Sequence, residues 1–234
     1  MAHDGQDLGG VTPVLLDDLL TLPGAAVAPV EAITELVRTK LREKLSVDGR
    51  VSGALVEENQ TAAHGLAWLA TYAESLRQMH KWAAALEEQS KFGEVEALIL
   101  QITFGEYLWQ VYGGIQMNQG EVLRLQDMGL SQDDMRGMME PAVMTLTQGG
   151  NTQAARIRLV ELMQERSAEI TVGASGLDEE LEMSREQFRR YAVEKVEPFA
   201  HDWHLKDELI PMEIIEELAE MGVFGQTIPD AYGG

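Results

Sequence analysis

The sequence predicts an all-α protein in which a helical bundle is followed by the first helices of a second domain. Apolar residues recur at spacings of three and four, which is the period of a helix that buries one face. The seven prolines and most glycines fall at the ends of these periodic segments, where they stop helices. No convincing strand precedes the last dozen residues. The pattern therefore favours helices packed on helices.

The first segments are expected to form an arm and the opening helix of the bundle. Residues 1–28 are expected to be a polar N-terminal arm with a short helix, and residues 29–168 the bundle. Proline suits the first position of a helix, so the opening helix is expected to begin at Pro29. Glu31 and Glu35 lie in its first turns, as the helix dipole favours. Its buried stripe is expected to comprise Val30, Ile33, Val37, Leu41 and Leu45.

The rest of the bundle is expected to contain two long helices and two shorter ones. The long helices are predicted over 55–88 and 92–118, where the apolar stripes are widest. The shorter helices are predicted over 131–147 and 151–167, with Ser131 as the N-cap of the first. Together these segments indicate an antiparallel bundle.

Composition changes after the bundle. Residues 169–177 lose periodicity and gather small side chains, which is typical of a linker. Residues 178–234 then show an apolar stripe on a helix that Pro198 should kink. Pro211 is expected to start a second helix that ends at Gly222 in a left-handed cap, after which the chain turns.

Charge and cysteine content exclude several classes of function. The 234 residues include 39 acidic and 18 basic side chains, a net charge of −21, which opposes binding to nucleic acid or anionic membranes. The most apolar stretch, 95–109, is shorter than the roughly 20 residues of a membrane span. Residues 1–10 are polar and predict no secretory signal. The absence of cysteine fits a reducing compartment, so a cytoplasmic protein is expected.

The sequence shows no motif that carries chemistry by itself. It has no glycine-rich phosphate loop, no Glu-x-x-His pair of a di-iron bundle and no serine in a nucleophile-elbow sequence. No residue is therefore assigned a catalytic, cofactor-binding or metal-binding role.

One histidine pair raises the question of a metal. His201 and His204 are one helical turn apart, with Asp202 and Asp207 nearby, so a surface metal site is conceivable. Two histidines without a fixed third ligand make a weak site. A solvated helix end is the favoured interpretation.

Other clusters also have two interpretations. Four methionines are either a flexible peptide-binding patch or, as we favour, part of a core stripe: Met135, Met138, Met139 and Met144. Four acids either attract a basic partner or, as we favour, cap a helix start: Asp178, Glu179, Glu180 and Glu182. His64 and His80 are expected at edge or core positions of the long helix over 55–88.

A resemblance to a known protein family indicates a function, which no local motif of the sequence does. The segment from Gln187 to Gly234 runs QFRRYAVEKVEPFAHDWHLKDELIPMEIIEELAEMGVFGQTIPDAYGG. It resembles the opening of the N-terminal helical domain of the flavin-dependent acyl-CoA dehydrogenases. The match is specific in order and spacing, from the helix around Pro198 to the Tyr-Gly-Gly turn at the end.

Upstream segments resemble the long helical N-terminal extension of one subgroup of that family, the methylsuccinyl-CoA dehydrogenases. They run TAAHGLAWLATYAESLRQMHKWA and FGEVEALILQITFGEYLWQVYGGIQMNQGE. The family continues well past the Tyr-Gly-Gly turn, so the resemblance implies a truncated chain. It covers most of residues 55–234.

The resemblance implies an enzyme whose chemical groups lie beyond Gly234. In the family, a glutamate removes the α-proton of an acyl thioester, a hydride passes to FAD, and an electron-transfer flavoprotein reoxidises the flavin. The resemblance implies a homo-oligomer that oxidises (2S)-methylsuccinyl-CoA to mesaconyl-CoA. This chain alone is expected to be inactive. The alternative is a non-catalytic helical protein that binds a partner through the bundle.

Overall fold

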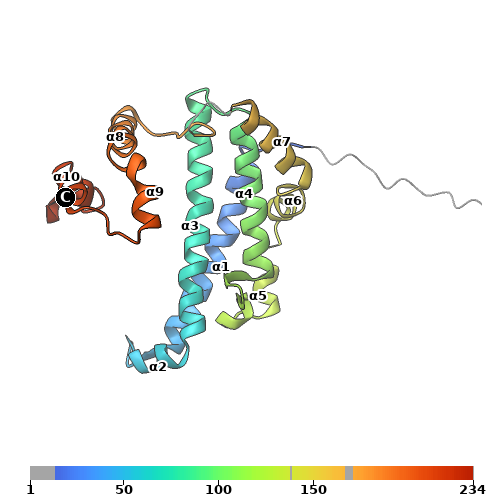
Figure 1. The fold of residues 1–234 in the computed structure, drawn as a ribbon. Coiled ribbons are helices and arrows are strands. Elements are labelled where there is room, and N and C mark those ends of the chain that lie inside the picture. Colours follow the sequence, from blue (N-terminus) through green and yellow to red (C-terminus); the bar gives the residue numbers. More distant parts are fainter. Residues whose placement is uncertain (1–13, 138, 167–170, 234) are drawn as a thin grey trace, which may run out of the picture. The chain divides into compact units, whose positions relative to one another are not determined.

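The computed structural model describes residues 14–137, 139–166 and 171–233, and the all-α prediction is confirmed for them (Figure 1). The chain divides into two compact units, residues 1–176 and 177–234.

Three long helices form the centre of the first unit. They are α1 (Leu22–Lys44), α3 (Gln60–Glu88) and α4 (Glu94–Gly113), and Figure 1 shows them side by side. The short connection between α3 and α4 makes these two helices antiparallel neighbours. The largest fully buried side chains of α3 and α4 are Leu69, Leu76, Leu86, Leu98, Leu100, Phe104 and Leu108. Removal of these apolar side chains from water is the main force that holds the bundle together.

Shorter helices cover the long ones. Helix α2 (Gly53–Glu58) precedes α3, and α5 (Gln132–Arg136) follows a 3-10 turn over 125–128. Helix α6 (Pro141–Gly149) packs on α1 and α4, and α7 (Gln153–Glu165) packs on α4. No helix among the described residues is both long enough and apolar enough to cross a membrane.

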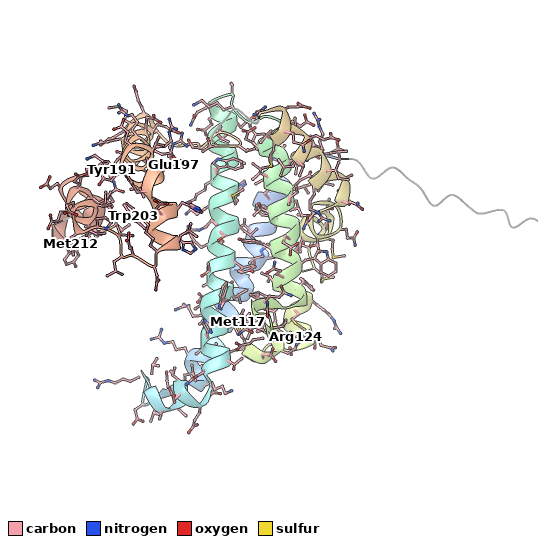
Figure 2. The ribbon with its side chains drawn as sticks, in the orientation of Figure 1. Met117, Arg124, Tyr191, Glu197, Trp203 and Met212 are labelled. Atoms are coloured by element: carbon pink, nitrogen blue, oxygen red, sulfur yellow. The ribbon has the colours of Figure 1, made fainter. Side chains whose placement is uncertain are left out.

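The expectation that strands are absent before the last dozen residues is wrong. Strands β1 (Ser46–Val47) and β2 (Arg50–Val51) form one short antiparallel hairpin, and β3 (Ile115–Asn118) and β4 (Glu121–Leu123) form another. In the first hairpin, an Asp-Gly pair adopts φ of 52° and 76°, as a tight hairpin turn requires. In the second, Figure 2 labels Met117 on β3 and Arg124 just beyond β4.

Several helix boundaries also differ from the prediction. Helix α1 begins at Leu22, so the start at Pro29 and an arm extending to residue 28 are wrong for this helix. Pro23 occupies its first turn, while Pro29 lies inside it. The helix continues because Ala26 and Val27 extend the buried stripe, and this packing outweighs the backbone hydrogen bond that Pro29 cannot make.

The other long predictions are interrupted. The helix predicted over 55–88 breaks at Asn59 into α2 and α3, and the helix predicted over 92–118 gives way to β3 after Gly114. Gly114 has φ of 133°, which ends a helix and which side chains rarely adopt. The helix predicted over 131–147 is two helices, α5 and α6, with Pro141 starting the second. The Ser131 cap is confirmed, since its hydroxyl oxygen accepts a hydrogen bond from the amide of Asp134 at 3.2 Å.

The second unit consists of α8 (Glu179–Tyr191), a π-helical turn (Ala192–Val196), α9 (Glu197–Leu205) and α10 (Met212–Glu220). The helix expected to kink at Pro198 instead has a π-helical turn just before this proline, where the Glu197 amide donates to the carbonyl of Ala192, five residues back. Gly222 adopts φ of 80°, which confirms the predicted left-handed cap. Two 3-10 turns, Val223–Gly225 and Asp230–Tyr232, follow.

Candidate functional site

The second unit has many exposed apolar side chains. No described side chain between residues 177 and 233 is buried, and Leu209 is 91% exposed. Figure 2 labels Tyr191 at the end of α8, Trp203 in α9 and Met212 at the start of α10. Large side chains of apolar or aromatic character with more than half of their surface exposed are Leu181, Met183, Phe199, Leu205, Leu209, Ile210, Met212, Phe224 and Tyr232. An apolar surface of this extent is typical of a protein interface.

Few interactions hold the second unit together. The Tyr191 hydroxyl donates to the carbonyl of Ile214 at 3.4 Å, and the Lys195 ammonium lies 3.3 Å from the Glu217 carboxylate. The neighbouring Tyr191 hydroxyl and Lys195 ammonium lower the pKa of Glu217. These contacts join α8 and the π-helical turn to α10, but all of the groups are accessible to water. We see no catalytic arrangement in them.

The acidic cluster at the start of α8 has a structural role. Asp178 is the N-cap, because its carboxylate accepts a hydrogen bond from the amide of Leu181 at 2.8 Å. Glu179, Glu180 and Glu182 occupy the first turn, where the helix dipole favours negative charge. Glu182 also pairs with Arg185 at 2.7 Å. The favoured interpretation as a helix cap is confirmed.

The histidine pair on α9 is not part of a metal-binding group. Asp202 forms an ion pair with Lys206 at 3.7 Å, and the Asp207 amide donates to the carbonyl of His204 at 3.3 Å. Across the described ranges, no three His, Cys, Asp or Glu side chains gather in a way that could hold a metal ion.

The methionines do not form one patch. Met135 packs against the core and its carbonyl accepts a hydrogen bond from the Tyr112 hydroxyl at 3.1 Å, whereas Met139 is 46% exposed. Met144 is half-buried on α6, and Met138 lies outside the described residues. A single core stripe is therefore also too simple an interpretation.

The histidines of α3 lie at its edges. His64 is exposed and its Nε2 accepts a hydrogen bond from the Trp68 indole at 3.1 Å. His80 is half-buried against α1, where a methyl group added to Gly24 would lie 3.0 Å from its ring. Both positions agree with the edge interpretation.

Two polar side chains are buried in α4, and sequence reasoning gave them no role. Glu96 is 4% exposed, and its carboxylate accepts hydrogen bonds from the amides of Gly93 at 3.0 Å and Ala174 at 2.8 Å. Gln101 is fully buried and bonds to the backbone of Leu16 at 3.0 Å and Val14 at 2.7 Å. The available signal was their position: both interrupt the most apolar stretch of the sequence. Their partners are backbone groups, so their role is structural.

A polar network joins α3, α4 and the connection between α6 and α7. Glu106 accepts hydrogen bonds from the side chains of Gln110 at 2.8 Å and Asn151 at 2.6 Å. The Tyr72 hydroxyl donates to the Gln110 side chain, and burial, followed by the nearby Tyr107 and Glu106, raises the pKa of Tyr72. Both oxygens of the Glu106 carboxylate are thus engaged. The network joins helices and offers no free acid or base.

Comparison of the sequence with known proteins identifies the family that this chain resembles. Residues 178–234 match the family model described as acyl-CoA dehydrogenase, N-terminal domain. The chain is 59% identical to the (2S)-methylsuccinyl-CoA dehydrogenase of Cereibacter sphaeroides over 220 residues, which are 94% of this chain and 39% of that protein. It is 34% identical to the glutaryl-CoA dehydrogenase of Desulfococcus multivorans over 58 residues, which are 25% of this chain and 15% of that protein. The resemblance inferred from the sequence is confirmed, and the chain spans well under half the length of either relative.

Proposed function

We propose that this chain is the N-terminal part of an FAD-dependent acyl-CoA dehydrogenase that oxidises (2S)-methylsuccinyl-CoA to mesaconyl-CoA. The observation that carries the proposal is the extent of the 59% identity, which covers 94% of the chain and so includes the helical bundle as well as the second unit. The glutaryl-CoA dehydrogenase match covers only 25% of the chain. The residues before the acyl-CoA dehydrogenase N-terminal domain therefore favour (2S)-methylsuccinyl-CoA dehydrogenase over glutaryl-CoA dehydrogenase.

The structure supports a role as part of a larger enzyme. The second unit buries none of its described side chains, so this group of about 57 residues gains little stability from burial. Further helices packed on its apolar side would supply the missing stabilisation. The proposal includes an acyl-CoA substrate, an electron-transfer flavoprotein as electron acceptor and a homo-oligomeric enzyme.

The described residues of this chain do not fit FAD. A dinucleotide presents a pyrophosphate, which needs backbone amides or basic side chains. One hollow, about 570 Å³ at the start of α3, contains Lys44 but also Glu57, Glu58 and Asp127. These three carboxylates would repel the phosphates. We therefore place FAD on parts of the enzyme outside this chain, and derive no catalytic step from residues within it.

A chimeric enzyme tests the proposal. In the Cereibacter sphaeroides protein, the matched segment would be replaced by this chain, and the purified chimera assayed for bound flavin and for oxidation of methylsuccinyl-CoA and glutaryl-CoA. The remainder of that protein without any N-terminal segment is the control. We expect the chimera to retain FAD and to prefer methylsuccinyl-CoA, while the control and this chain alone are inactive and hold no flavin.

Two outcomes would contradict the proposal. A folded, flavin-containing chimera no more active than the control would favour the alternative, a non-catalytic helical protein that binds a partner. Stoichiometric flavin retained by this chain alone after gel filtration would show that the flavin site has been placed wrongly.

A further inference from the structure

The segment that follows the bundle is held on its surface. Residues 171–176, here called the strap, lie within the stretch expected to be a linker and belong to the first unit. The amide of Ala174 donates to the Glu96 carboxylate at 2.8 Å, and the carbonyl of Ala174 accepts a hydrogen bond from the Trp82 indole at 3.0 Å. Both backbone groups of one residue are thus bound by side chains from two different helices.

The glycines of the strap fit this contact closely. Gly173 and Gly176 have φ of 85° and 73°, conformations that favour glycine. A methyl group on Gly176 would lie 2.9 Å from Cδ1 of Trp82, and one on Gly173 would lie 3.3 Å from the Glu96 carboxylate. The side chain of Val172 adds apolar contact with the small core cluster of α4 and α7. The strap therefore combines hydrogen bonds, apolar contact and glycines at its tightest points.

From these contacts we infer that the strap is a clasp, a built-in conformational device through which Trp82 and Glu96 fix the point where the chain leaves the bundle. Trp82 lies in the last two turns of α3 and Glu96 in the first turn of α4, so the clasp forms only when both helices are in their packed positions. Opening it would free residues 171–176 without unfolding the bundle. The inference concerns the first unit alone and does not depend on the proposed enzyme activity.

Hydrogen exchange on the full chain tests the clasp. Trp82→Phe removes the indole donor while keeping an aromatic ring, and Glu96→Gln removes the carboxylate while keeping the shape of the side chain. Loss of a hydrogen bond should speed amide exchange in the strap about 2- to 10-fold in each variant. Peptides of α4 beyond its first turn should be unchanged, since within that turn Glu96 also accepts the amide of Gly93. Trp109→Phe is the matched control, because Trp109 is an exposed tryptophan of α4 whose loss should leave the strap unaffected.

A third variant guards against general destabilisation. Gly176→Ala places its methyl group 2.9 Å from Trp82 at the end of the strap, while the buried Leu86 lies at an ordinary contact distance of 3.6 Å. This variant should also speed exchange in the strap alone. If Trp82→Phe speeds exchange in α4 as well, Gly176→Ala shows whether the strap can open without general destabilisation of the bundle. Exchange of the Ala174 amide at the rate of a free peptide in the unaltered chain would overturn the inference, as would a strap that responds to Gly176→Ala no more than to Trp109→Phe.

Discussion

Gly105, in the middle of α4, lies against the backbone that connects α6 to α7. A methyl group at this position would lie 2.4 Å from the amide nitrogen of Asn151 and 3.0 Å from the carbonyl carbon of Gly150. Side chains essentially never make contacts below 3.0 Å, and backbone atoms cannot rotate away as the end of a flexible side chain can. The substitution Gly105→Ala must therefore move α4 away from the start of α7.

Two opposing effects set the size of the change. Alanine in place of glycine inside a helix stabilises it by up to ~1 kcal/mol. Overpacking of a close-packed contact destabilises by about 1–3 kcal/mol, and a contact with backbone at 2.4 Å belongs at or above the upper end. We expect a net loss of about 2 kcal/mol, which lowers the Tm of a chain of this length by about 4–8 °C.

The same helix offers a matched control. Gly113 is the last residue of α4, and a methyl group there would have Cε3 of Trp109 as its nearest neighbour, at 4.0 Å. Gly113→Ala should leave the Tm unchanged or raise it slightly. Thermal unfolding can be followed by tryptophan fluorescence, since Trp68, Trp82 and Trp109 all lie in the first unit. A Tm for Gly105→Ala equal to or above that of Gly113→Ala would refute the close approach of these helices.

Three further predictions concern burial, charge and the second unit. Leu69→Asp puts an unpaired carboxylate at a fully buried position of α3 and should abolish cooperative unfolding. Val160→Asp, at a half-exposed position of α7, should shift the Tm by only a few degrees. Similar thermal unfolding curves for both variants would contradict the assigned core. Hydrogen bonds from the backbone and hydroxyl of Ser131, and from Lys40, lower the pKa of Asp134 to about 2. The stabilising effect of the Asp134 carboxylate is therefore present above a pH of about 4 and is lost as the pH falls through about 2. The free energy of unfolding of Asp134→Asn should lack this pH-dependent contribution. Titration of the Asp134 carboxyl near pH 4 in NMR would count against the prediction. Residues 178–234 carry 15 acidic and 5 basic side chains and bury no described side chain. Their amides should therefore exchange much faster than those of α3 and α4, and added salt should slow this exchange because it screens the repulsion between the acidic side chains. Equal protection from exchange in both units would contradict this prediction.

Much of the bundle could be predicted from the sequence because apolar periodicity reports burial directly. All five residues of the stripe from Val30 to Leu45 are buried. The two long helices predicted over 55–88 and 92–118 also bury apolar side chains, such as Leu69 in α3 and Leu98 in α4. These positions are determined by the hydrophobic effect, which depends on residue type and spacing.

Boundaries were less predictable because tertiary contacts decide them. The start of α1 depends on whether Ala26 and Val27 find partners, which the sequence around Pro29 does not reveal. The first hairpin did carry a local signal, the Asp-Gly pair at 48–49, but its strands are only two residues long and show no alternation. The roles of Glu96 and Gln101 could not be predicted, because their partners lie up to 87 positions away in the chain.

The bonds of Gln101 also bear on the order in which the protein folds during synthesis. Its side-chain amide bonds to Val14 and Leu16 near the beginning of the described chain and to the carbonyl of Gly150 at 3.4 Å near the end of α6. Closing such long loops has an entropic cost that only later packing offsets. On the ribosome, the segment before α1 therefore has to wait until α4 and then Gly150 have emerged. The earliest described residues to be made are among the last to reach their final position.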